Sequence, residues 1–117
     1  MTESKDRFLE NVRLYVEAGE QLAEGIASFN EINRSGLRDM EAGMTVTESF
    51  AKRDSAEWSR NVTMLLDRFE TTRRKTRKSA ADALLEEGRS TREIGAAFGT
   101  TRQWADRLVR KPADPDA

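Results

Sequence analysis

The stretch from Ser90 to Lys111 constrains the fold most strongly, because it combines two short helical patterns with a glycine between them. Ser90 and Glu93 have the spacing of a capping box, in which each side chain bonds the backbone N–H of the other residue, so a helix is expected to begin there. Gly99 follows the last apolar residue of that helix and suits a left-handed turn. Thr101 then caps a second helix.

A further glycine, Gly95, lies inside the first of these two helices. Glycine in mid-helix costs about 1 kcal/mol relative to alanine, and its usual structural reason is the close approach of another helix. We therefore expect the helix that begins at Arg102 to pack against Gly95. The shared core would consist of Ile94, Phe98, Ala105 and Leu108, with Trp104 partly buried beside it.

The run REIGAAFGTTRQWADRLV, residues 92–109, resembles the helix-turn-helix of bacterial transcription regulators, of the DNA-binding part of resolvases and of the promoter-element reader of sigma factors. Seven positions have the family's spacing: an isoleucine, a small residue, an apolar residue, a glycine, a capping hydroxyl and two further apolar residues. Thr100 and Ala105 depart from the pattern, which more often has valine and a larger aliphatic residue there. The resemblance covers about the last third of the chain.

The resemblance implies that the second helix lies in the major groove and that the first crosses the DNA backbone. Arginine can offer two donors to guanine, glutamine a donor and an acceptor to adenine, and aspartate an acceptor to cytosine. Asp106 could instead orient Arg102 or Arg110. The candidates for base reading are Arg102, Gln103, Asp106 and Arg107. The candidates for phosphate contacts, which position a protein without reading sequence, are Thr91, Arg92, Thr101, Arg110, Arg89, Arg74, Arg77 and Lys78.

Charge is distributed unevenly along the chain, although the net formal charge is only −1. Residues 1–70 contain 9 Lys/Arg and 14 Asp/Glu, whereas residues 71–111 contain 11 Lys/Arg and 5 Asp/Glu. A local excess of positive charge attracts phosphates whatever the total charge is. The run RRKTRK, residues 73–78, favours phosphate contact; the alternative is a solvated face near a helix end.

Two longer apolar stripes predict helices in the N-terminal part. The first stripe steps by four and three residues and predicts a helix over Lys5–Asn33. Gly36 and Gly43 bracket a predicted connection, and a second capping box at Thr45 predicts the start of a second long helix. Ser79 is expected to cap a separate support helix that ends near residue 87.

These elements predict an all-α fold, in which an N-terminal long helical hairpin for dimerisation or partner binding (residues 1–72) precedes a C-terminal trihelical helix-turn-helix domain (residues 73–111). Residues 112–117 are expected to form a disordered tail. One hairpin cannot bury both of its stripes, so a second copy would complete a four-helix interface. A monomer of five helices is the alternative. The predicted interface residues are Phe8, Val12, Tyr15, Leu22, Ile26, Phe29, Trp58, Val62, Leu65 and Phe69.

Composition argues against an enzyme. The chain has no cysteine and no histidine, so disulfides, thiolate ligands and the commonest metal ligand and general base are missing. We expect no cofactor, no metal site, no small-molecule ligand and no effector pocket. No apolar run approaches the roughly 20 residues of a membrane span, and residues 1–20 do not resemble an export signal. A cytoplasmic, nucleoid-associated protein of bacterial type is expected.

The sequence therefore predicts a homodimeric transcriptional regulator that reads an inverted repeat in double-stranded DNA. One alternative is an architectural protein, or a plasmid or phage segregation protein, that binds arrays of sites. Another is an antitoxin or adaptor whose acidic N-terminal helices bind a partner protein. A resolvase is not expected, because the chain is too short for its catalytic domain.

Overall fold

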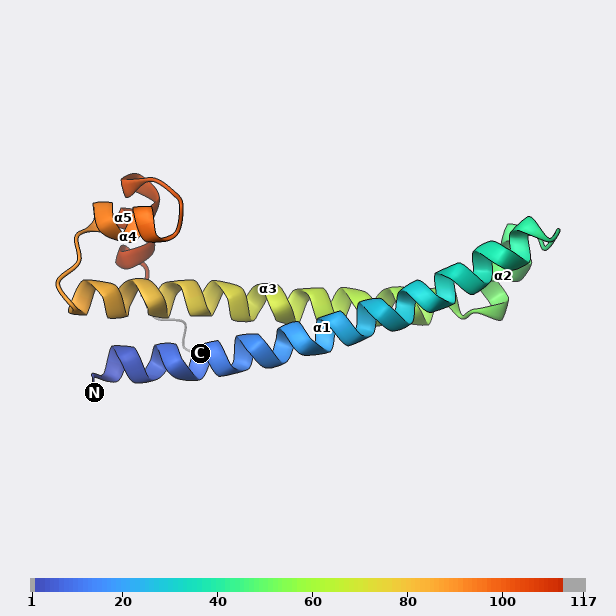
Figure 1. Ribbon diagram of the computed structural model, residues 1–117, viewed down its shortest axis with the longest axis horizontal. Helices are drawn as coiled ribbons and strands as arrows, with labels where there is room; N and C mark the ends of the chain where they lie inside the picture. Colours follow the sequence, from blue (N-terminus) through green and yellow to red (C-terminus); the bar gives the residue numbers. More distant parts are fainter. Residues whose placement is uncertain (1, 113–117) are drawn as a thin grey trace. The chain divides into compact units, whose positions relative to one another are not determined.

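The computed structural model describes residues 2–112, which form five helices and no strand (Figure 1). They are α1 (Glu3–Glu41), α2 (Val46–Lys52), α3 (Ser55–Glu86), α4 (Thr91–Ala97) and α5 (Arg102–Arg110). The predicted all-α class is confirmed. Of the tail predicted to be disordered, residues 113–117 lie outside the described residues.

The chain divides into two compact units, and both long helices contribute to each. One unit contains residues 17–70, and the other combines residues 1–16 with residues 71–117. The division of the chain into a pairing segment (1–72) and a DNA-binding segment (73–111) stays a prediction.

In the unit of residues 17–70, α1 and α3 run antiparallel. Gly19 lies opposite Phe69, Gly25 lies against Leu65, and the Asn33 Oδ1 atom accepts a hydrogen bond of 2.7 Å from Arg53. Phe29 and Trp58 stack with ring centroids 6.4 Å apart. The two apolar stripes therefore cover part of each other within one chain.

The first helix is longer than predicted, because α1 continues through Gly36 to Glu41. Gly36 was expected to begin the connection, but it is buried in the helix, and a Cβ atom there would lie 3.0 Å from the side chain of Arg53. The glycine therefore provides space for packing and does not break the helix. The turn comes at Gly43, whose φ is +115°.

The second long helix was predicted as one piece, which is wrong. The capping box at Thr45 is present, but it opens the seven-residue α2, which ends at Lys52 with Arg53 as its C-cap. Asp54 has a φ of +48°, and α3 begins at Ser55. Aspartate is one of the few residues with a side chain that adopts this left-handed conformation readily, so the break occurs without glycine or proline.

Ser79 does not cap a separate helix, because α3 runs without interruption from Ser55 to Glu86. The Ser79 hydroxyl bonds the carbonyl oxygens of Lys75 and Thr76, both at 3.0 Å, and it accepts a hydrogen bond of 3.0 Å from Asn11 of α1. Serine can bond back to its own helix in this way without ending it. Asn11, Thr76 and Ser79 thus form a buried polar network between α1 and α3.

Candidate nucleic-acid interface

The start of α4 has the predicted capping box. The Ser90 Oγ atom accepts a hydrogen bond from the Glu93 N–H, and the Glu93 Oε1 atom accepts one from the Ser90 N–H, both at 3.1 Å. Arg89 lies 3.5 Å from the same carboxylate. These contacts use backbone donors that the first turn of a helix cannot satisfy internally, and they fix where α4 begins.

The turn between α4 and α5 also agrees with the glycine predictions. Gly99 has a φ of +67°, in the left-handed region. The Thr100 N–H donates a hydrogen bond of 2.8 Å to the Gly95 carbonyl. A Cβ atom on Gly95 would lie only 2.6 Å from the carbonyl oxygen of Thr101. The backbone that leads into α5 therefore lies directly against Gly95, which confirms the predicted close approach.

Thr101 caps α5, and its hydroxyl accepts a hydrogen bond of 3.1 Å from the Trp104 N–H. The inward face of α5 packs into a small core with α4 and the C-terminal part of α3 (Figure 1). Trp104 is half-buried and contacts the Phe98 ring edge-on, with centroids 5.3 Å apart. The buried members of this core are Ala81, Ile94, Ala105 and Leu108.

The capping box makes the start of α4 sensitive to acid. The Ser90 N–H, the Ser90 hydroxyl and then Arg89 hold the pKa of the Glu93 carboxyl below its ordinary value. Because the folded state lowers this pKa, the contribution to stability is present above the ordinary pKa of glutamate and is lost as the pH falls through the lowered value. We expect an NMR titration of Glu93 to give a lower midpoint in the wild type than in Ser90→Ala. Equal midpoints would contradict this account.

Three of the four residues predicted to read bases are exposed on α5, namely Arg102, Gln103 and Arg107. They lie on the face opposite Ala105 and Leu108, which are buried. Asp106 is half-buried, and its Oδ2 atom lies 3.9 Å from the Nε atom of Arg102. The separation is that of an i, i+4 ion pair and is longer than a hydrogen bond.

The residues predicted to contact phosphates have different surroundings. Arg74, Arg89, Arg92, Thr101 and Arg110 are exposed, and Thr91 is half-buried. The guanidinium carbon of Arg77 lies 6.0 Å from the centroid of the Trp104 ring, which is within reach of a cation–π contact.

Lys78 is held by two polar contacts. Its Nζ atom lies 2.8 Å from Asp82 and donates a hydrogen bond of 3.2 Å to the Val109 carbonyl oxygen, and only 12% of its side chain is exposed. The ammonium thus satisfies a carbonyl at the C-terminal end of α5, where positive charge is favourable. A phosphate contact would compete with this structural role. The i, i+4 spacing of Lys78 and Asp82 was the sequence signal for the pair.

The residues predicted to form a dimer interface are all half-buried within the single chain. Among them, Phe29 stacks on Trp58, while Leu65 and Phe69 lie against glycines of α1. Contacts between α1 and α3 therefore account for part of their burial, and a second copy could cover only the remainder.

Across residues 2–112, no three carboxylate side chains gather in a group that could hold a metal ion. None of the helices in that range has both the length and the apolar character needed to cross a membrane. Comparisons with protein-family models, with curated proteins and with solved structures found no significant match.

Proposed function

We propose that this protein binds double-stranded DNA in a sequence-specific manner and acts as a dimeric transcriptional regulator. The observation that carries the proposal is the division of α5 into two faces. Its inward face contributes Ala105 and Leu108 to the core, while its outward face presents Arg102, Gln103 and Arg107 to solvent. In a helix-turn-helix, a helix of this kind enters the major groove with its N-terminal residues at the base edges.

The outward side chains have the chemistry that base reading requires. Arg102 and Arg107 can each present two donors to a guanine, and the amide of Gln103 can pair with an adenine. Asp106 lies 3.9 Å from Arg102 on the same face of α5, so its carboxylate is also available to accept a hydrogen bond from a cytosine.

The surrounding charge favours a polyanionic partner. Residues 71–111 contain 11 Lys/Arg and 5 Asp/Glu. Arg89, Arg92 and Arg110 are exposed near the ends of α4 and α5. Such residues contact phosphates and hold the recognition helix in register without reading sequence. Binding should therefore weaken steeply as the salt concentration rises.

A second copy is proposed to pair through α1 and α3. The half-buried stripe on these helices leaves apolar surface to be covered, and each of these helices also has large apolar side chains that are exposed, including Val16 and Met64. A symmetric dimer would bind an inverted repeat whose half-sites lie about one helical turn, roughly 34 Å, or a multiple of it apart.

Selection of bound fragments from sheared genomic DNA at about 150 mM salt tests this proposal. We expect the wild type to enrich a defined inverted repeat. The double variant Arg102→Ala, Arg107→Ala should lose that enrichment but keep weak binding that depends on salt. Two lost base contacts correspond to about 2–6 kcal/mol of discrimination.

The matched control replaces two exposed arginines outside the candidate interface, Arg34→Ala and Arg60→Ala. This variant should enrich the same repeat as the wild type. If the wild type enriches no sequence, α4 and α5 form a packing unit or a non-specific clamp. If it enriches single half-sites with no fixed spacing, the dimeric part of the proposal is wrong.

A further inference from the structure

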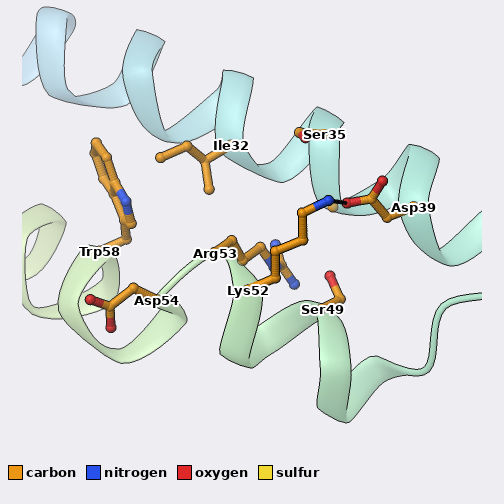
Figure 2. Close-up of a pocket in the computed structure, with 9 residues that line it drawn as sticks. Ile32, Ser35, Asp39, Ser49, Lys52, Arg53, Asp54 and Trp58 are labelled. Carbon is orange, nitrogen blue, oxygen red and sulfur yellow. Dashed lines mark hydrogen bonds and ion pairs between the residues drawn. The ribbon is translucent and has the colours of Figure 1, made fainter.

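A cavity of about 400 Å³ lies between α1, α2 and the first turn of α3, inside the unit of residues 17–70 (Figure 2). Its walls combine apolar side chains, Ile32 and Trp58, with polar and charged ones. The volume is in the range of small-molecule sites. The cavity exists because the chain breaks at Asp54 and α2 folds back against α1, so its residues belong to three separate elements.

Two polar atoms of residues that line this cavity are almost inaccessible to solvent and have no hydrogen-bond partner in the part of the chain that the structure describes. They are the Oγ atom of Ser49 and the Nε atom of Arg53, one helical turn apart. Ser49 is only 1% exposed, and Figure 2 shows its hydroxyl pointing toward α1. A buried polar group without a partner is costly, and most such groups in proteins are satisfied. Both groups can act as donors, so they favour a ligand that brings acceptors.

The charge of Arg53 points to an anionic ligand. Its Nη1 atom donates to Asn33, which is neutral, and its guanidinium lies 4.8 Å from the centroid of the Phe50 ring. Among residues 2–112, no carboxylate lies within ion-pair distance of Arg53. The carboxylate of Asp54 points away from it in Figure 2. A half-buried cation without a counter-charge is unfavourable, and an anion in the cavity would relieve this.

An ion pair crosses from α2 to α1 in the wall of the cavity. Lys52 reaches Asp39 with its Nζ atom 2.8 Å from Oδ2, as the dashed line in Figure 2 marks. This pair neutralises Asp39, which would otherwise repel an anion.

We propose that this cavity binds a small carboxylate that carries a flat apolar group. The guanidinium of Arg53 would hold the carboxylate, as arginine does in paired N–H···O geometry. Ser49 would donate a further hydrogen bond, and the apolar group would lie between Ile32 and Trp58. The proposal concerns residues 32–58 alone and does not depend on DNA binding.

The test is a titration of the ¹⁵N-labelled full chain followed by NMR, with benzoate as the probe and benzamide as its uncharged analogue. The reporters are the Arg53 Nε–H and the Trp58 indole N–H. Benzoate should shift both signals saturably below about 10 mM, and benzamide should not. No saturable shift with benzoate, or equal shifts with both probes, would overturn the proposal.

Variants locate the site. Arg53→Met should weaken benzoate binding by about tenfold or more, because it removes a hydrogen-bonded charge. Arg60→Met is the matched control, since Arg60 is exposed and paired with Glu57, and it should bind benzoate as the wild type does. If Arg53→Met does not fold, Ser49→Ala replaces it, with a smaller loss of affinity expected. Unchanged affinity in a folded Arg53→Met variant would contradict the assignment.

Discussion

Replacing Ile94 by alanine is expected to lower the free energy of unfolding of the α4–α5 core by about 2–5 kcal/mol. Ile94 is completely buried, and the other buried members of its cluster are two alanines and Leu108. Alanine side chains cannot move to fill the space that a larger residue leaves. The loss therefore includes a cavity cost in addition to the lost burial of apolar surface.

Amide hydrogen exchange of α4 and α5 would measure this loss where it occurs. Leu85→Ala is the matched control, because Leu85 lies in the last turns of α3 and is 46% exposed. It should change stability by about 0.5 kcal/mol or less. If the two variants lost equal stability, the cluster around Ile94 would not be the source of stability in this part of the chain.

Gly95→Ala is expected to destabilise the same core by about 1–2 kcal/mol, although alanine is the better helix former. The higher helix propensity of alanine contributes about 1 kcal/mol in favour. Against it, the new methyl group would lie 2.6 Å from the Thr101 oxygen and 2.8 Å from the Thr101 carbonyl carbon. These are backbone atoms, so relief requires α5 to shift, and overpacking of this kind costs about 1–3 kcal/mol or more.

Gly19→Ala provides the comparison, since it makes the same change in mid-helix. The nearest atom to a Cβ there would be Phe69 Cε1 at 3.5 Å, which is ordinary contact. Gly19→Ala should therefore stabilise the protein by up to about 1 kcal/mol. Urea denaturation of both variants measures the two effects, which should have opposite signs. A gain in stability from Gly95→Ala would mean that α5 has room to move.

Under the proposed function, Gly95→Ala should also weaken DNA binding, because α5 is displaced.

The α4–α5 region could be predicted from sequence because its signals are local. The pairs Ser90–Glu93 and Thr101–Trp104 lie three residues apart, and Gly99 determines its own turn. Each of these features is decided by a few neighbouring residues. Gly95 required one further step, the inference that a glycine in mid-helix admits a second helix.

The long helices were harder to delimit, because their ends depend on distant contacts. Glycine is common at helix ends, yet Gly36 lies inside α1 with the side chain of Arg53 packed against it. Serine is a common helix cap, yet the hydroxyl of Ser79 bonds Asn11 and two carbonyl oxygens of its own helix. The left-handed conformation at Asp54 occurs without a glycine, so the sequence carried no signal for it. The cavity at Arg53 was missed for the same reason, since it forms only where the chain breaks at Asp54.

The small residues of the α4–α5 core also bear on how this protein can change over time. Ala81 and Ala105 are both fully buried, so the helices are held by the close contact of their backbones and by Ile94 and Leu108. The outward residues of α5 have no share in that packing. Mutations at positions 102, 103 and 107 can therefore accumulate with little effect on folding, so under the proposed function a descendant of this chain could read a different DNA sequence on an unaltered scaffold.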